Sequence, residues 1–528
     1  MTARARYDAL RGTRDDFLST GIEAARLTLP YILKQDDTNS EHKNLQTPWQ
    51  SVGAKGVVTL ASKLMLALLP VNTSFFKLQM DEAQLTKYDM DPQIKSDLEL
   101  SFSKMEKTIM ESIAASDDRV VIHQALKHLV ISGNALIYMA KDKLKMYPLN
   151  RYVIQRDGMN NVIEIVCKEQ ISRKLLATQV PEDILPKPND PMDNSQGSAK
   201  ADQVDVYTHI KRDGSRFVWH QEVFDKILPK SRGSAPVETT PWIALRFNHV
   251  DNEAYGRGRV EEVMGDLKSL EALCQALVEG SAAAAKVVFT VSPSSTTKPA
   301  TLAGARNGAI VQGRPDDIGV VQVGKTADFS TVLQMMQTLE KRLADAFLIM
   351  QVRDSERTTA EEVRMSQMEL EAQLGGLFSM LTVEFLVPYL NRKLSIMQKA
   401  GQIPKLSKDM VRPTIVAGVN ALGRGQDREA LTMFMQTIAQ TMGPEAISQY
   451  INPAEVVKRL ATADGIEVLN LVKTQQEIQG EQEQAQQQQQ QMEMTKQAGK
   501  FAEVAQKEQE ANDQLNTQTE ATAAQAGA

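Results

Sequence analysis

Residues 260–285 read VEEVMGDLKSLEALCQALVEGSAAAA, and residues 327–349 read ADFSTVLQMMQTLEKRLADAFLI. In both stretches apolar residues recur every three or four positions, the spacing that places them on one face of a helix. The residues between them contain short β-rich segments, at 287–291, 309–312 and 318–323, separated by Pro, Ser, Thr and Gly. This order predicts two long helices joined by a small β module.

The half of the chain before this region combines helices with short strands. Helical spacing predicts four helices, at 7–33, 54–68, 91–116 and 120–132. Pro30 limits how far the first of them can run. The last should end at Gly133, because glycine adopts the left-handed conformation that often terminates a helix. Strands are predicted at 135–139, 144–147, 152–155, 162–166, 204–210, 216–220 and 242–247, with a hairpin at Asp213-Gly214 and a polar surface loop at 180–203. The fold class is therefore α+β and predominantly helical.

The pattern changes twice after residue 350. A charged link at 351–359 contains Arg353 and Arg357, and a very long helix should follow it to about Leu394. Gly375-Gly376 and Pro388 should bend this helix, because paired glycines and prolines are recognised causes of kinks. Shorter helices are expected at 424–472. From Thr474 the chain is rich in Gln, Glu and Ala, so we expect a disordered or loosely coiled tail.

Composition limits the classes of function. The 528 residues include 60 Lys and Arg against 66 Asp and Glu, a formal net charge of −6. A generally basic nucleic-acid coat is excluded, so phosphate contacts must come from local basic patches or from a surface that encloses the polymer without gripping it. The 2 cysteines, Cys167 and Cys274, give neither a disulfide framework nor a zinc spacing. The longest apolar stretch near the start, residues 64–71, is too short for a membrane span.

One stretch matches the P-loop expression residue for residue: Gly319-Val320-Val321-Gln322-Val323-Gly324-Lys325-Thr326. Lys325 and Thr326 would be its nucleotide-binding residues. A phosphate cradle needs backbone that curls so that successive N–H groups converge, whereas Val-Val-Gln-Val favours an extended strand. No apolar strand ending in an acidic magnesium ligand follows. We favour a strand, a turn and a helix start, and keep the nucleotide site as an alternative.

No set of residues predicts catalysis, a cofactor or a metal site. The six histidines are scattered, and His123 and His128 lie five positions apart, which does not align two ligands on one helix face. The acidic pairs Glu261-Glu262 and Glu361-Glu362 fall in first turns of predicted helices, where the helix dipole favours acids. We expect no enzyme activity.

Several segments between about residue 45 and residue 430 carry distinctive sequences. They are Thr47-Pro48-Trp49-Gln50-Ser51-Val52-Gly53-Ala54-Lys55-Gly56 with residues 60–68, Gly133-Asn134-Ala135-Leu136 with Tyr138, Tyr255-Gly256-Arg257 with Gly265-Asp266-Leu267, Gly313-Arg314-Pro315, Glu356-Arg357 with Thr359-Ala360-Glu361-Glu362, and Gly423-Arg424-Gly425-Gln426-Asp427. In sequence and in order, these segments resemble the portal proteins, the head-to-tail connectors of short-tailed double-stranded-DNA phages.

The resemblance implies a portal-type subunit of a ring, usually dodecameric, with DNA passing along its axis. Its regions would be an α+β wing (1–254), a first stem helix (255–286), a β-rich clip (287–326), a second stem helix (327–350), a tunnel loop (351–358), a bent wing helix with the following segment (359–423), a crown (424–473) and the Gln-rich tail (474–528). No function is carried onto the tail.

The resemblance also implies site residues and partners. Arg353 and Arg357 would face DNA in the tunnel loop, and Arg306 and Arg314 would lie on the docking surface of the clip. The expected partners are further copies of the chain, double-stranded DNA, the terminase large subunit, a tail adaptor protein, and capsid and scaffolding proteins, with no membrane. The ring would be assembled in the host bacterial cytoplasm and reside at the portal vertex of the virion.

Two alternatives come from other classes. A P-loop NTPase would use Gly319 to Thr326, and Lys325→Ala would abolish nucleotide binding in that case only. A helical scaffolding or internal virion protein is suggested by the Gln-rich end.

Overall fold

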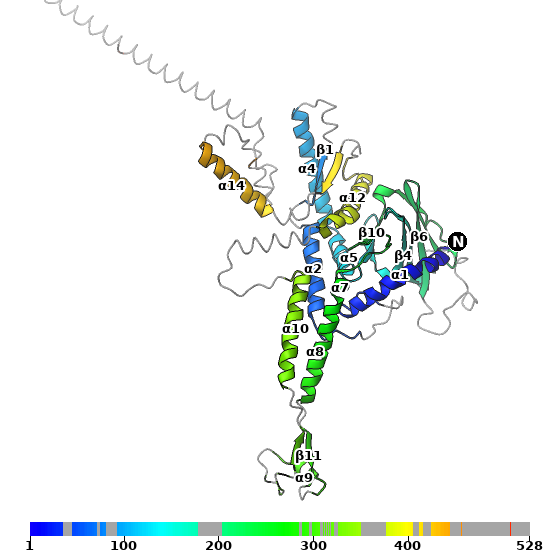
Figure 1. The fold of residues 1–528 in the computed structure, drawn as a ribbon. Helices are drawn as coiled ribbons and strands as arrows, with labels where there is room; N and C mark the ends of the chain where they lie inside the picture. The colour runs from blue at the N-terminus through cyan, green and yellow to red at the C-terminus, as the bar shows by residue number, and fades with distance from the viewer. Residues whose placement is uncertain are drawn as a thin grey trace, which may run out of the picture. The chain divides into compact units, whose positions relative to one another are not determined.

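The computed structural model describes residues 1–34, 45–70, 74–80, 92–177, 203–284, 288–294, 298–306, 318–321, 326–349, 376–404, 411–415 and 424–443, with a few single positions, among them 310, 312, 314 and 316. The chain divides into two compact units, Met1–Leu422 and Gly423–Ala528. Helices and strands are both present and helix predominates, which confirms the predicted mixed, mainly helical class. Figure 1 gives the element labels used below.

Helices near the start of the chain pack around one continuous apolar core. They are α1 (Ala3–Arg26), α2 (Val52–Leu68), α4 (Pro92–Ala114) and α5 (Asp118–Ser132). The first helix ends at Arg26, four residues before Pro30, the residue expected to limit it. The last ends as predicted, with Gly133 in the left-handed region at φ 73°. The core includes Leu60, Leu64, Leu126 and Leu129, all at most 1% exposed, so α2 and α5 are buried against each other.

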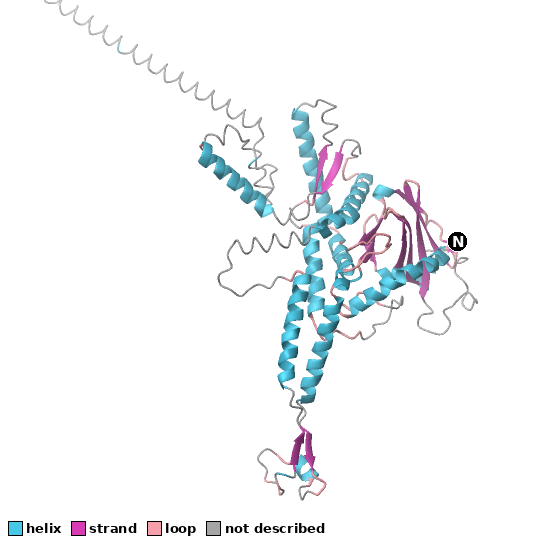
Figure 2. Cartoon of the chain, viewed as in Figure 1, coloured by secondary structure: helices cyan, strands magenta, loops and turns pink. Residues whose placement is uncertain are grey.

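Two antiparallel sheets form the β part of the first half (Figure 2). The smaller has the order β10-β2-β3, built from β2 (Asn134–Met139), β3 (Leu144–Tyr147) and β10 (Trp242–Arg246). The larger has the order β4-β5-β6-β7-β8, with β9 also pairing β7. Its strands are β4 (Tyr152–Arg156), β5 (Val162–Ser172), β6 (Gln203–Asp213), β7 (Arg216–Val223), β8 (Lys226–Ile227) and β9 (Gly233–Pro236), accompanied by η1 (Leu149–Arg151), α6 (Arg173–Ala177) and η4 (Val237–Thr239).

The β6–β7 hairpin of the larger sheet turns at the residues that favour a tight turn. Asp213 pairs Arg216 at the end of the β6–β7 hairpin, and Gly214 takes a positive φ of 56°. This is the hairpin that Asp213-Gly214 predicted. The predicted loop at 180–203 falls almost entirely outside the described residues.

The helix, β module, helix order is present, with one correction. A single helix was expected from 260 to 285, but α7 (Arg259–Glu262) is separated from α8 (Met264–Ala284) at Val263, whose φ of −113° departs from helical geometry. The module contains β11 (Val288–Val291) paired antiparallel with β12 (Ile318–Val321), and a short α9 (Pro299–Ala303) that was not predicted. The predicted strand at 309–312 lies largely outside the described residues. α10 (Thr326–Ala346) follows.

The helix predicted after the charged link is described from residue 376. It contains a π turn, η6 (Thr382–Leu386), and continues as α12 (Val387–Lys399). The Val387 N–H donates to the carbonyl of Thr382. This hydrogen bond spans five residues where an α-helix spans four, and it lies directly before Pro388, which has no N–H to donate.

β1 (Phe76–Met80) pairs antiparallel with β13 (Val411–Ile415), and sequence reasoning missed both strands. In the second unit α14 (Arg424–Met442) ends at Gly443, where φ is 90°.

Candidate functional site

The predicted stem is an antiparallel pair of helices, α8 and α10, that lie side by side in Figure 1. Leu267 and Leu270 of α8 and Leu343 of α10 are fully buried in the common apolar core. Arg342 of α10 forms an ion pair with Asp266 of α8 at 3.3 Å. Near the other end, a Cβ added at Gly280 of α8 would lie 3.1 Å from the Phe329 ring of α10. These two contacts show which residues of α8 and α10 lie opposite each other along the helix axes.

Helix α2 supports the end of α10. A Cβ added at Gly56 would lie 2.5 Å from ring atoms of Phe347, so only glycine lets the ring pack directly on the helix backbone. Lys63 Nζ donates to the carbonyl of Leu348 at 2.6 Å, and Arg259 Nε donates to that of Ala346 at 3.1 Å. Cations are favoured at a helix C-terminus, whose carbonyls lack helical partners. Burial lowers the pKa of Lys63. The residues just before position 350 are therefore firmly held.

Contacts with β10 also hold the helix that is described from residue 376. Glu384, in the π turn, accepts from Arg246 of β10 through the backbone N–H at 3.0 Å and the guanidinium at 2.6 Å. Nearby, burial and the charge of Arg246 lower the pKa of Arg156 to about 10. Removing Glu384 would leave Arg246 buried beside another cation.

A second group of contacts holds α12. Tyr389 Oη donates to Asp118 of α5 at 2.7 Å, and Lys393 Nζ donates to the same carboxylate at 3.2 Å. Burial and the neighbouring Asp118 raise the pKa of Tyr389, so its hydroxyl remains a donor. Nothing in the sequence pattern paired these residues, which lie more than 270 positions apart.

Two of the signature segments meet at the end of α5. Asn134 Nδ2 donates to the carbonyl of Gly256 at 2.7 Å, and the Gly256 N–H donates to Asn134 Oδ1 at 2.8 Å. The backbones also approach closely, because a Cβ at Gly133 would lie 2.4 Å from the carbonyl carbon of Arg257. Gly133-Asn134 and Gly256-Arg257 thus form one junction that joins α5 and β2 to the segment before α7.

A third signature segment is attached to α8. The backbone N–H groups of Trp49 and Gln50 donate to the Glu271 carboxylate at 2.9 and 3.3 Å. The Gln50 side chain donates to the carbonyl of Leu27 and accepts from the Gly53 N–H. This network connects the start of α2 with α8 and the end of α1.

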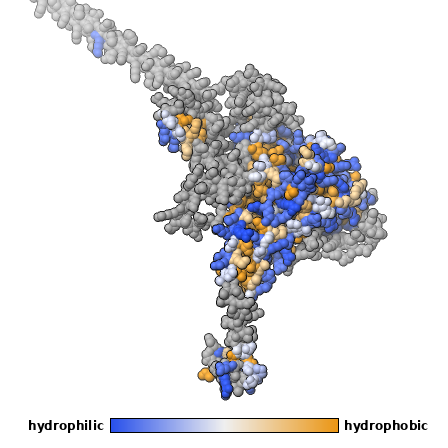
Figure 3. All heavy atoms as spheres, viewed as in Figure 1, coloured by the Kyte–Doolittle hydropathy of each residue, from blue (hydrophilic) through white to orange (hydrophobic). Residues whose placement is uncertain are grey.

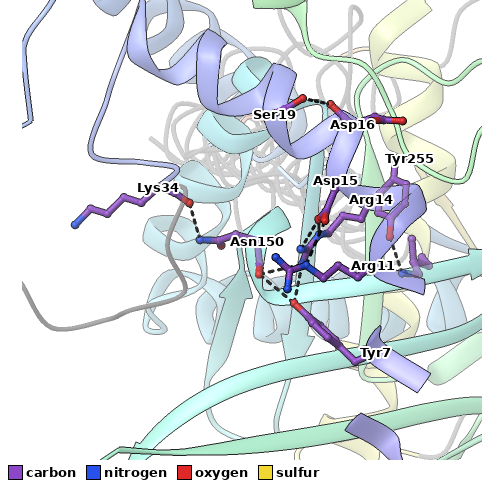
Figure 4. Close-up of polar contacts among 10 residues, drawn as sticks. Tyr7, Arg11, Arg14, Asp15, Asp16, Ser19, Lys34, Asn150 and Tyr255 are labelled. Atoms are coloured by element: carbon purple, nitrogen blue, oxygen red, sulfur yellow. Dashed lines mark hydrogen bonds and ion pairs between the residues drawn. The ribbon is translucent and has the colours of Figure 1, made fainter. Parts of the chain in front are cut away.

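Polar contacts also fix α1 to η1, the short helix between β3 and β4, as Figure 4 shows. Arg14 is 2% exposed, and its guanidinium donates to Tyr7 Oη at 2.6 Å and to the Asn150 carbonyl at 3.2 Å. Tyr255, from another signature segment, accepts from the Ile154 N–H at 3.0 Å. The signature residues therefore include several that bind different elements together.

The predicted site residues are placed as follows. Arg353, Arg357 and Lys325 lie outside the described residues. Arg306 and Arg314 are both exposed, so a partner's surface could reach them. Thr326 is the first residue of α10, and Gly319 to Val321 are strand residues paired with β11. The beginning of the P-loop match is therefore extended backbone, as Val-Val favours, and not a phosphate-cradling turn.

Within the described ranges, no group of three or more His, Cys, Asp and Glu side chains is arranged to hold a metal ion. None of the helices in this part of the chain combines the length and apolar content of a membrane span.

Comparison with known proteins identifies relatives over most of the chain. The family model for the bacteriophage head to tail connecting protein matches residues 1–472. The portal protein of Escherichia phage T7 is 36% identical over 488 residues, covering 90% of this chain and 89% of the relative. The portal protein of Enterobacteria phage T3 is 37% identical over 487 residues, with the same coverage of each. A chain from the neck of an empty gene transfer agent particle aligns over 79% of this chain and 90% of its own length, at 12% identity and a TM-score of 0.36.

Proposed function

Since the chain belongs to the bacteriophage head-to-tail connecting protein family and is similar to portal proteins over about 90% of its length, we propose that it forms the ring at one capsid vertex through which double-stranded DNA enters and leaves. The family match over residues 1–472 is the observation that carries this proposal. The resemblance predicted from the signature segments is confirmed by the same match.

The charge of the chain suits a ring that lets DNA move. A strongly basic channel would hold phosphates through counterion release, whereas this chain has a net charge of −6. In the proposed ring, Arg353 and Arg357 supply a local positive contact at the narrow point of the channel. Their segment follows α10, whose last turn is held by Lys63 and Arg259, and precedes the helix held by Glu384.

The regions keep their expected roles in this proposal. Residues 1–254 form the wing, α7, α8 and α10 the stem, 287–326 the clip, 359–423 the bent wing helix and following segment, and 424–473 the crown. The exposed Arg306 and Arg314 lie in the clip, where we place docking of the terminase large subunit and later of the tail adaptor. The wing and crown would contact capsid and scaffolding proteins.

The role is structural. Hydrolysis of ATP belongs to the terminase motor in this proposal, and the portal supplies the channel and the docking surfaces. A closed ring of identical subunits, usually twelve in this family, requires two different complementary faces on each subunit.

Labelling of assembled heads tests the location. The full chain with a C-terminal histidine tag is assembled into heads and labelled with nickel-coated gold, with untagged chain as control. Gold at a single vertex is expected. Gold at many vertices, or throughout the interior as for a scaffolding or internal virion protein, would contradict the proposal.

A further inference from the structure

The α8–α10 pair presents exposed apolar side chains on two opposite faces. Leu333 and Met335 of α10 are 48% and 53% exposed, and Val278 of α8 is 51% exposed. Figure 3 shows hydrophobic surface among hydrophilic surface along the described part of this pair. Exposed apolar side chains gathered on one element mark interaction sites more often than isolated ones do.

The first face is the side of the α8–α10 pair whose upper end packs against α2. Phe347 contacts Gly56 of α2, and Leu267 lies against Gly53. Leu333 precedes Phe347 by fourteen residues, about four helical turns, and Val278 follows Leu267 by eleven residues, about three turns. Both therefore lie on the side of the pair that faces α2, beyond the part of it that α2 covers. We call Val278 and Leu333 the α2-side face.

The opposite face carries the ion pair between Asp266 and Arg342. Met335 precedes Arg342 by seven residues and Leu273 follows Asp266 by seven, about two turns in each case. Both lie on the ion-pair side, where Leu273 is partly buried against the core. We call Leu273 and Met335 the ion-pair face.

Leu333 and Met335 therefore point about 200° apart around α10 but differ in height by only about 3 Å. Rotation about a ring axis that runs along the stem moves no residue in height. It brings one face of a subunit against the other face of its neighbour. The proposed ring requires such a heterologous contact, and this pair of faces supplies one.

The outer edge of α10 is polar, unlike the two apolar faces of the helix pair. Gln334 and Lys341 lie seven residues apart at exposed positions of α10, on the side away from α8. Buried centres of subunit interfaces are depleted of charged residues, so this edge suits water better than a seam.

We propose that neighbouring subunits stack their stems face to face, with Leu333 of one copy against Met335 of the next. This seam rests on the ring proposed above. The partner is a second copy of this chain. The helix pair then stands edge-on to the channel, and its polar edges are left for water.

Paired cysteines test this seam. The full chain carrying Leu333→Cys and Met335→Cys is first shown to be a ring by size and imaging, and is then oxidised or treated with a short bismaleimide. A ladder of covalent oligomers on denaturing gels is expected, rising to the full ring. The two cysteines point to opposite sides of one helix, so they cannot react within a chain. The native Cys167 and Cys274 are buried.

Two controls make the result specific. Each single cysteine variant should give no ladder. The pair Ala272→Cys with Gln334→Cys, on the outer edges, should remain monomeric on the gel. Intact rings with no ladder from the 333/335 pair, or a ladder from the 272/334 pair instead, would overturn the seam. Absence of any ring in the unmodified chain would refute the proposed function itself, which separates the two failures.

A charge exchange provides a second test that needs no crosslinking. Leu333→Asp and Met335→Lys should each reduce the fraction of ring at least tenfold, because each places one charge in an apolar seam. The double variant should recover ring, since the carboxylate introduced at position 333 of one copy would meet the ammonium group introduced at position 335 of the next. Equal loss in the double variant, with each monomer still folded, would overturn the pairing.

Discussion

Asn134 and Gly256 bind each other through two hydrogen bonds, of 2.7 Å from Asn134 Nδ2 to the Gly256 carbonyl and 2.8 Å from the Gly256 N–H to Asn134 Oδ1. Asn134 is 1% exposed. One side chain thus satisfies both backbone groups of a residue 122 positions away, and it fixes the start of β2 to the segment before α7. An amide is the side chain that offers a donor and an acceptor together.

Asn134→Ala should therefore destabilise the fold by about 2–3 kcal/mol, because it leaves both polar groups of Gly256 buried without this partner. Denaturant unfolding of the purified protein measures the loss. Gln275→Ala, which removes an exposed side chain bonded to Glu279 of its own helix, should change stability by less than about 0.5 kcal/mol. Equal effects of the two substitutions would contradict the assigned role.

Gly56→Ala should loosen the support of α10. Its Cβ would lie 2.5 Å from the Phe347 ring, so α2 or the ring must move, at a cost of about 1–3 kcal/mol. Gly265→Ala is the matched control, because a Cβ there meets open space and alanine is the better helix former by up to about 1 kcal/mol. Thermal unfolding should thus move in opposite directions for the two variants. A stabilising Gly56→Ala would refute the contact.

The stability of the fold should depend on pH through His128 of α5. Burial lowers the pKa of this histidine from its ordinary value of 6.5 to about 4. Between about pH 6.5 and pH 4 the unfolded chain binds a proton that the folded chain does not, so stability falls as the pH falls through this window. The loss is on the order of 3 kcal/mol.

Unfolding free energies of His128→Leu should vary less over that window than those of the unmodified chain. Gln275→Ala, which removes no titratable group, should leave the pH dependence unchanged. A slope that persists in His128→Leu would assign the effect to other groups.

The outline of the fold could be predicted from local signals. Periodicity located α2, α5 and α10, and Gly133 and Asp213-Gly214 marked a helix end and a hairpin because their backbone conformations favour those residues. The break at Val263 was missed because the apolar stripe continues through it. The pairing of β1 with β13 and of Asp118 with Tyr389 was missed because those partners lie far apart in sequence and neither carries a local signal of the other.

The function was recognised from signature segments whose contacts the structure now explains. Gly133-Asn134 contacts Gly256-Arg257. The Gln50 side chain accepts from the Gly53 N–H at the start of α2. Gly56 packs against the Phe347 ring. None of these contacts follows from spacing alone, because each joins elements that only the tertiary fold brings together.

Replacing Arg353 and Arg357 together by Ala should weaken retention or translocation of DNA more than assembly of the ring, because it removes the positive contact proposed for the narrow point. Packaged DNA per head and its loss over time are the measurements. The pair Arg306→Ala and Arg314→Ala is the control. It should leave retention within the channel intact and weaken binding of terminase or the tail adaptor. Normal packaging and retention in the 353/357 variant would refute the tunnel-loop assignment.

Negative-stain imaging of the purified full chain tests the central claim most directly, because a channel requires a closed ring. We expect closed rings with a central hole. Monomers or irregular filaments at every protein concentration would contradict the portal function proposed for this chain.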